Sequence, residues 1–218
     1  TVNAIISQGI LPAGLEMMDR LAIKAAEAFV KVGYPLDAEG LLICELDGTD
    51  AEVQHQIEKL RLILDKNNAI QVRVATDAAE RMQLWLGRKA AFPAVGRLAP
   101  DYYCMDGTIP RSALAAVLAQ ITKFSEQHGL EVANVFHAGD GNLHPLILYD
   151  ANKAGEIERA EAFGADILNL CIEVGGTITG EHGVGVEKID QMCIQFTPEE
   201  LELFHGVKSA FDESRILN

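Results

Sequence analysis

The chain has 218 residues, of which 49% are hydrophobic and 23% are charged, and these proportions are ordinary for a folded globular protein. Its formal net charge of -14 at pH 7 would repel a polyphosphate backbone, so nucleic acid is not expected as a partner. The apolar stretch over residues 21–32 is interrupted by Lys24, Glu27 and Lys31, and no segment approaches the roughly 20 apolar residues that span a bilayer. We therefore expect a single folded unit.

The four cysteines lie far apart in the sequence and form no C-x-x-C pair. They are Cys44, Cys104, Cys171 and Cys193, each with apolar neighbours. We interpret them as buried free thiols of a cytoplasmic protein, with disulfides as the alternative.

The first elements are predicted from the spacing of apolar residues. Residues 2–8 form an extended lead, and residues 15–32 carry apolar side chains at helical spacing. A buried strand is predicted over residues 40–46, a helix over 49–66 and an alternating strand over 69–75. Together these segments form a β-α-β unit.

A second set of elements follows the same order. Residues 77–98 are predicted to be helical, with a bend or an end near Pro93. An extended segment over 102–109, a helix over 110–128 and a strand over 131–138 come next. Two split β-α-β halves of this kind suggest a ferredoxin-like arrangement.

The remaining elements complete the predicted fold. Residues 142–149 form a hairpin with the preceding strand, and a long helix over 154–174 leads into a glycine-rich passage. A final helix over 197–211 is opened by Thr197 and Pro198. We therefore predict an α+β fold with a ferredoxin-like antiparallel sheet, helices on one face of the sheet and a C-terminal helical segment.

The sequence His-Ala-Gly-Asp-Gly-Asn-Leu-His starts at His137 and lies between two apolar strands. Asp140 and Gly141 are a preferred pair for a two-residue type I′ turn, in which both central residues have positive φ. Counting outward from that turn places His137 directly opposite His144 on the same face of the hairpin, with Cβ atoms roughly 4.5 to 5.5 Å apart. Two imidazoles at this separation can share one divalent metal ion.

A second motif, Gly-Glu-His-Gly-Val-Gly, covers residues 180–185 after the long helix. Glycines on both sides of Glu181 and His182 let the backbone turn sharply and approach a ligand closely. One carboxylate beside His137 and His144 would complete a His, His, Glu ligand set with open positions, and His182 would then be free to act as a general base.

Each of these motifs also has a structural explanation. A single histidine on a strand is usually a packed core residue, and Asp-Gly hairpins are common in proteins without any site. Residues 180–185 could instead grip a phosphate, but they lack the Lys and Ser/Thr of a P-loop. The pairing of the two motifs favours the metal site.

Arg88, in the sequence Trp-Leu-Gly-Arg, carries a rigid fork that suits an organic carboxylate. The alternative is a cation on a helix surface. Tyr102, Tyr103 and Asp106 on the neighbouring extended segment are candidates for lining the same cavity, although an aromatic strand face packed on helices is the preferred interpretation.

Four segments resemble a known family: HAGDGNLHP, TGEHGVG, GRKAAFPAVGRLAPDYYCMDGTIPR and LPAGLEMMDRLAIKAAE. They are similar to the C-terminal domain of FAD-linked oxidases in the vanillyl-alcohol oxidase superfamily. Within that family the sequence resembles the glycolate oxidase D subunit branch most, with D-lactate and D-2-hydroxyglutarate dehydrogenases as relatives. The resemblance covers essentially the whole chain.

This resemblance implies a role for each candidate residue. His137, His144 and Glu181 correspond to the family's divalent metal site, with Zn, Mn or Fe as candidates; His182 corresponds to its base and Arg88 to its substrate-carboxylate ligand. A lysine that relatives acting on dicarboxylates carry is replaced here by Cys104, which argues against recognition of a second carboxylate.

The resemblance also implies the reaction and its cofactor. Residues 1–218 would form the substrate- and metal-binding cap domain of a flavin-dependent D-2-hydroxy-acid dehydrogenase, a CH-OH oxidoreductase. FAD would be held mainly by an N-terminal domain with a Gly-rich loop, and because these residues contain no such loop, we expect that domain to lie outside this sequence and the fragment alone to be inactive.

The implied partners are a small 2-hydroxy acid, the protein's own FAD-binding domain and other glycolate oxidase subunits, including an iron-sulfur electron acceptor. A homodimer, and attachment of this cytoplasmic protein to the inner membrane through partner subunits, remain open. Two alternatives come from other classes. One is a stand-alone metal-dependent hydrolase, and the other is a non-catalytic binding module anchored by a metal.

Overall fold

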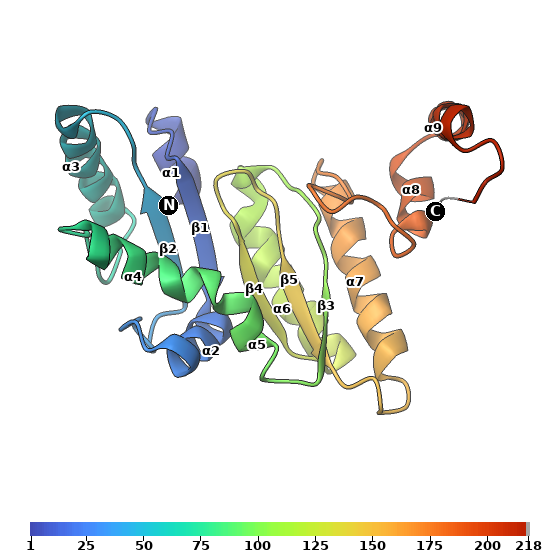
Figure 1. The fold of residues 1–218 in the computed structure, drawn as a ribbon, viewed down its shortest axis with the longest axis horizontal. Helices are drawn as coiled ribbons and strands as arrows, with labels where there is room; N and C mark the ends of the chain where they lie inside the picture. The colour runs from blue at the N-terminus through green and yellow to red at the C-terminus, as the bar shows by residue number, and fades with distance from the viewer. Residues whose placement is uncertain (217–218) are drawn as a thin grey trace.

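Five antiparallel strands form one sheet in the computed structural model, which describes residues 1–216 (Figure 1). The strands are β1 (Gly14–Asp19), β2 (Gly40–Glu45), β3 (Asp101–Cys104), β4 (Val132–His137) and β5 (Pro145–Tyr149). Their order across the sheet is β2-β1-β4-β5-β3. This antiparallel sheet, combined with long helices, confirms the predicted α+β class.

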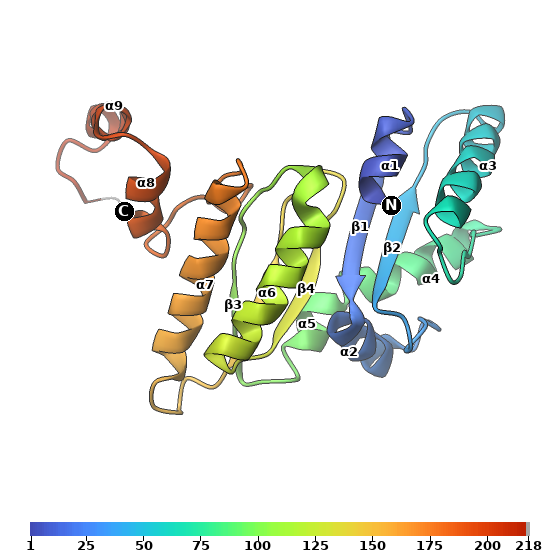
Figure 2. The same ribbon diagram turned by 180° about the vertical axis from the view of Figure 1, so that it is seen from behind.

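Helices cover both faces of the sheet, which corrects the prediction that they lie on one face. They are α1 (Val2–Ser7), α2 (Arg20–Val30), α3 (Asp50–Lys66), α4 (Ala78–Lys89), α5 (Ala91–Val95), α6 (Leu114–His128), α7 (Glu156–Glu173), α8 (Ile189–Gln195) and α9 (Pro198–Phe211), with a short 3₁₀ turn η1 (Arg111–Ala113) before α6. In Figure 1 the face toward the viewer carries α2 and α5, and Figure 2 shows α6 and α7 on the opposite face.

The sequence of β4 explains why both faces are covered. Ala133 and Val135 pack in one apolar cluster with residues of α2 and α5, whereas Phe136 packs in another with residues of α6 and α7. Successive strand residues point to opposite faces, so an almost continuous apolar run needs helices on both sides.

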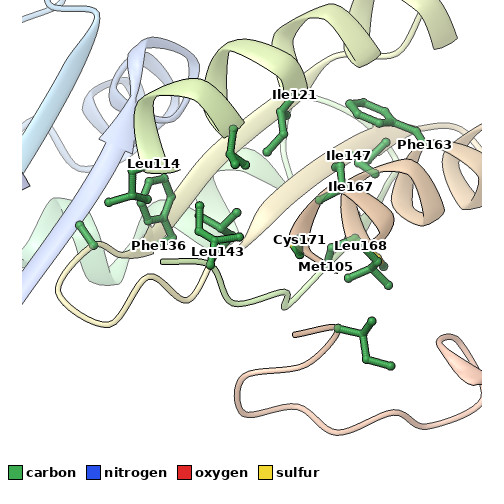
Figure 3. Packing of buried hydrophobic residues seen from close by; sticks show 14 of the residues in the cluster. Met105, Leu114, Ile121, Phe136, Leu143, Ile147, Phe163, Ile167, Leu168 and Cys171 are labelled. Atoms are coloured by element: carbon green, nitrogen blue, oxygen red, sulfur yellow. The ribbon is translucent and has the colours of Figure 1, made fainter. Parts of the chain in front are cut away.

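The packing between the sheet and α6 and α7 is shown from close by in Figure 3. Phe136 and Ile147 come from β4 and β5, Ile121 from α6, and Phe163 and Ile167 from α7, and all five side chains are fully buried. This core fixes the hairpin of β4 and β5 on which the two motif histidines lie.

The ferredoxin-like arrangement applies to the second half of the described chain and not to the first. There, β5 lies between β3 and β4, which are therefore parallel to each other, and α6 connects them as in a split β-α-β unit. In the first half, β1 and β2 are direct antiparallel neighbours, so α2 connects adjacent strands.

The helix predicted over residues 15–32 begins as strand β1 and becomes helical at Arg20. Asp19 caps α2, because its side chain accepts a hydrogen bond of 2.9 Å from the backbone amide of Ala22. Leu15 and Met18 are both buried within β1, and their spacing equally fits a helical face. The apolar pattern therefore hid the boundary.

Three other segments differ from the prediction. The extended lead predicted over residues 2–8 is instead helix α1 over residues 2–7, which buries Ile5. Residues 69–75 are loop, and Ile70 is exposed there, so this segment has no buried apolar face to support a strand. Helix α8 lies in the glycine-rich passage, for which no helix was predicted.

Two predicted helix boundaries are confirmed. The helical segment 77–98 is interrupted at Ala90, and α5 then contains Pro93, which has no N–H to continue the hydrogen bonding of α4. Thr197 caps α9 in a reciprocal capping box with Glu200.

Helices α8 and α9 form a C-terminal arm at the end of α7, and Figures 1 and 2 show α9 projecting away from the sheet. The exposed apolar side chains of α9 are Leu203, Phe204, Val207 and Phe211. None of the helices in residues 1–216 combines the length and the apolarity that crossing a membrane requires.

Candidate functional site

The two motif histidines lie on the same face of the β4–β5 hairpin, but not directly opposite each other. Asn134 pairs with Pro145 and His137 with Asn142, so the register differs from the predicted one by two residues. His144 accepts a backbone hydrogen bond from Val135 and is therefore the diagonal neighbour of His137. Their ring centroids are 5.3 Å apart.

The turn accounts for the difference in register. In this part of the structure Gly141 has a positive φ of 76° and Asp140 does not, so the turn is not type I′. The backbone amides of Asp140 and Gly141 both donate to the carbonyl of His137. The carbonyl of Gly141 accepts from Ile109, which ties the hairpin loop to the segment that follows β3.

Glu181 lies close to both histidines. Its Oε1 is 3.0 Å from Nε2 of His144 and 3.7 Å from Nε2 of His137. One ligand atom from each of these three residues lies within 4.8 Å of the other two, which fits the size of a site for a single metal ion. The structure thus brings His137, His144 and Glu181 together, as the sequence predicted.

The state of His144 favours a ligand role. Burial and the nearby rings of His137 and His182 lower its pKa to about 4, so the ring is neutral near pH 7. Neither ring nitrogen has a hydrogen-bond partner among the described residues. The 3.0 Å contact with Glu181 is short in distance, but its angles do not make it a hydrogen bond. A buried nitrogen with a free lone pair is what a cation would satisfy.

Glu16 of β1 is a site residue that the sequence analysis missed. Its Oε1 lies 2.7 Å from Nδ1 of His137, and its Oε2 lies 3.0 Å from Nε and 2.8 Å from Nη2 of Arg88. A carboxylate on the far nitrogen of a histidine fixes the tautomer and orientation of the ring, as is usual for metal-bound histidines. Glu16 escaped notice because β1 was predicted as helix, where it would not face β4.

Arg88 therefore sits at the end of a chain that leads from His137 through Glu16. Its side chain is mostly buried, which excludes the alternative of a cation on a helix surface. A carboxylate bound by Arg88 would have to share the guanidinium group with Glu16.

His182 lies beside the three clustered residues. Its ring stacks on that of His144 with centroids 5.0 Å apart and an interplanar angle of 7°. Its Nε2 is 3.7 Å from Oε1 of Glu181, and its side chain is about half exposed. The imidazole is thus both close to the cluster and accessible to a ligand.

Asp106, which follows β3, is completely buried and anchors the loop that carries Glu181 and His182. It accepts hydrogen bonds from the backbone amides of Gly180 and His182, each at 2.6 Å. Burial alone would raise the pKa of Asp106, but these hydrogen bonds and the charge of Lys188 outweigh it and lower the pKa to about 2. Asp106 is therefore ionised and does not line the cavity as a free carboxyl.

Tyr102 and Tyr103 of β3 pack against helices, which is the interpretation preferred from the sequence. Tyr102 makes an edge-on contact with Phe92 of α5. The ring of Tyr103 lies against Gly164 of α7, where an added Cβ would come within 2.9 Å of it. Both rings thus pack on helices.

A cavity of about 420 Å³ adjoins the cluster. Its lining residues are Thr108, His137, Asp140, Asn142, Gly180 and Glu181. The volume is in the range of small-molecule sites, and all lining residues except Gly180 have polar side chains. A small polar ligand in it would touch two of the clustered side chains.

The chain is thus an α+β domain that groups two histidines and a glutamate beside a cavity, which makes this group a candidate metal centre. The whole chain, residues 1–218, matches the family described as "FAD linked oxidases, C-terminal domain". The chain belongs to this family, which confirms the resemblance carried by its motifs.

Curated relatives include the "Glycolate oxidase subunit GlcD" of Escherichia coli (strain K12), 61% identical over 100% of this chain and 44% of that protein. The protein of the same name from Bacillus subtilis (strain 168) is 37% identical over 100% of this chain and 46% of its own length. The mitochondrial D-lactate dehydrogenase (cytochrome) of Arabidopsis thaliana is 29% identical, covering 99% of this chain and 38% of that one. The chain thus spans less than half the length of these relatives.

Solved structures share the fold at low sequence identity. A p-cresol methylhydroxylase with substrate bound matches with a TM-score of 0.66 and 14% identity, over 99% of this chain and 48% of that one. A 4-ethylphenol oxidase from Gulosibacter chungangensis matches with a TM-score of 0.68 and 14% identity, over 99% and 49%.

Proposed function

We propose that this chain is the substrate- and metal-binding part of a flavin-dependent D-2-hydroxy-acid dehydrogenase of the glycolate or D-lactate type. Its reaction would convert a 2-hydroxy acid to a 2-oxo acid. The observation that carries this proposal is the grouping of His137, His144 and Glu181 beside a cavity that His137 and Glu181 line, with His182 next to them. The family and the names of its relatives support the same class and do not favour a stand-alone hydrolase.

The donor set suits a divalent cation. Two imidazole nitrogens and one carboxylate oxygen leave coordination positions open for a ligand, and they select only weakly among Zn, Mn and Fe. A cation bound there would lower the pKa of a substrate hydroxyl group. Glu16 would keep His137 oriented toward the ion through its hydrogen bond to Nδ1.

His182 is the proposed general base. Its half-exposed ring can accept the hydroxyl proton at a ring nitrogen while it stays stacked on His144. Arg88 is proposed to bind the substrate carboxylate, with Glu16 holding the guanidinium group in place.

FAD would accept the hydride that leaves the α-carbon. We propose that the flavin is bound mainly by a part of the protein outside these 218 residues, because the relatives are more than twice as long as the segment they share with this chain. The name of two of these relatives describes a subunit, which supports other subunits as partners. An iron-sulfur electron acceptor among those subunits, and a homodimer of this chain, are further parts of the proposal. The proposed location is the cytoplasm, with attachment to the inner membrane through partner subunits as the alternative.

Two substitutions in the full-length protein test the proposed roles. His182→Ala should lower kcat by about a hundredfold to ten-thousandfold, the range for a lost proton-transfer group, and leave bound metal unchanged. His137→Ala should lose metal first and activity in consequence, and added metal should partly restore its turnover.

The measurement is metal content beside turnover with a small 2-hydroxy acid for each variant. His55→Ala, at an exposed position of α3, is the control that should change neither. A His182→Ala protein that lost its metal while His137→Ala kept it would reverse the two roles.

A further inference from the structure

Three consecutive backbone amides of the loop that carries Glu181 and His182 point at one side chain. The carboxylate of Asp106 accepts from the amides of Gly180 and His182 at 2.6 Å, and from that of Glu181 at 3.2 Å. Converging amides of this kind form a concave anion site in many proteins. In this chain, the anion is a side chain from 74 to 76 residues earlier in the sequence.

Two side chains complete the same anchor. Oγ1 of Thr179 donates to Asp106 at 2.8 Å and accepts from the amide of Gly183 at 2.9 Å, so it connects both ends of the turn. Nζ of Lys188 lies 3.2 Å from Oδ2 of Asp106, and Lys188 is only 2% exposed. A buried ammonium group and a buried carboxylate are each stable here because each has the other.

The side chain of Glu181 is about half exposed, and that of His182 nearly so. Apart from the stacking of His182 on His144, the position of these two side chains therefore depends mainly on the backbone that carries them. The loop also lies tightly against its surroundings, because a Cβ on Gly180 would come within 2.5 Å of Oδ1 of Asn142.

We propose that Asp106 and Lys188 are positioning residues, which hold residues 179–183 in the conformation that places Glu181 at the cavity and His182 against His144. The inference rests on the proposed function for what these two side chains do. The new part of the inference is that the positions of Glu181 and His182 are set by the buried ion pair of Asp106 and Lys188, which does not itself contact the substrate. Partners of this kind, one contact removed from a ligand, typically change metal affinity or activity by about 10- to 100-fold when they are lost.

The test uses the full-length, flavin-containing protein and Mn²⁺ as the probe. Asp106→Asn keeps the shape of the side chain but replaces one acceptor oxygen with an amide donor that faces backbone N–H groups. We expect Mn²⁺ to bind about 10- to 100-fold more weakly and kcat at low Mn²⁺ to fall by a similar factor, with partial recovery at high Mn²⁺. Lys188→Met should change both quantities in the same direction.

Thr179 supplies a milder pair of variants if Asp106→Asn does not fold. Thr179→Val removes the hydroxyl group that links Asp106 to Gly183, and Thr179→Ser restores it. Thr179→Val should weaken Mn²⁺ binding, and Thr179→Ser should bind as the wild type does, which a general loss of stability would not explain.

The matched control is Asp19→Asn. Asp19 also accepts from two backbone amides, those of Ala22 and Asn134, but it is the last residue of β1, beyond Glu16, which is the β1 residue that pairs with His137. This variant should melt at a lower temperature and keep the wild-type affinity for Mn²⁺. Wild-type Mn²⁺ affinity and kcat in Asp106→Asn and Lys188→Met, with only the melting temperature lowered, would overturn the proposal.

Hydrogen exchange of amides 180–182 separates this proposal from the proposed function. Faster exchange of these amides in Asp106→Asn than in the wild type or in Asp19→Asn is expected even if the wild-type protein binds no Mn²⁺. A wild-type protein that binds no Mn²⁺ would reject only the proposed metal site. Unchanged exchange of amides 180–182 in Asp106→Asn would reject the role of Asp106 in holding the loop.

Discussion

Among single residues, the cysteines differ sharply in their surroundings. All four are free thiols, as predicted, but Cys193 on α8 is exposed, so the prediction that all of them are buried is wrong at this position. Burial raises the pKa of Cys44 to about 11 and that of Cys104 and Cys171 to about 12. At pH 8 these three therefore hold almost no thiolate, which is the reactive form.

We expect one thiol of the 218-residue chain to react quickly with a disulfide reagent at pH 8 and three to react slowly. Cys193→Ser should abolish the fast phase, whereas Cys171→Ser should remove only a slow equivalent. A fast phase that survives Cys193→Ser would show that one of the other thiols opens to solvent.

The contacts of the site divide into those that sequence reasoning can predict and those that it cannot. His137, His144 and Glu181 belong to two local motifs, and their grouping follows from a hairpin and a glycine-rich loop. Asp106 and Lys188 are 82 residues apart and share no pattern, because their pairing depends on where β3 and α8 lie in the fold. Only the structure reveals a contact of that kind.

Among the secondary-structure elements, the β4–β5 hairpin depends on Gly141. Its φ of 76° is unfavourable for other residues, and an added Cβ would lie 2.1 Å from the carbonyl oxygen of Ile109. Gly155, at the N-terminus of α7, has a similar φ of 81° but open space around it. An alanine would therefore strain the backbone at both positions, but only at position 141 would its Cβ also clash with a neighbouring atom.

Gly155→Ala should lower the free energy of unfolding by about 1 kcal/mol, the usual scale for a left-handed non-glycine residue. Gly141→Ala should lower it by about 3 kcal/mol or more, because the clash with a backbone oxygen adds to the strain. Urea unfolding of both variants gives the comparison. Equal losses would mean that the segment around Ile109 moves aside at little cost.

The same hairpin shows why element types were easier to predict than their pairing. The apolar runs of β4 and β5 and the Asp-Gly turn predicted both strands correctly. The register was wrong because the hydrogen bond from Ile109 to Gly141 holds a longer loop, and that bond comes from outside the hairpin. Likewise, β1 was hidden because its two faces are both partly buried, so its apolar residues lose the simple alternation of a half-exposed strand.

For the molecule as a whole, the main consequence concerns the flavin. The family is one of FAD-linked oxidases, and this chain spans 44% to 46% of its glycolate oxidase relatives. We expect the 218-residue chain, purified alone, to lack stoichiometric flavin and 2-hydroxy-acid dehydrogenase activity, because it contains no Gly-rich loop for a diphosphate. Absorbance of the purified chain checks this. A yellow preparation with one flavin per chain would show that these residues bind FAD by themselves.

The anchor at Asp106 binds the site loop through main-chain amides, which every residue except proline supplies. The side chains at positions 181 and 182 can therefore be replaced while the backbone amides keep their hydrogen bonds to Asp106. In the proposed metal site, this would separate the scaffold from the donor atoms, and Glu181→His or Glu181→Asp would then change the cation preference without disturbing the loop.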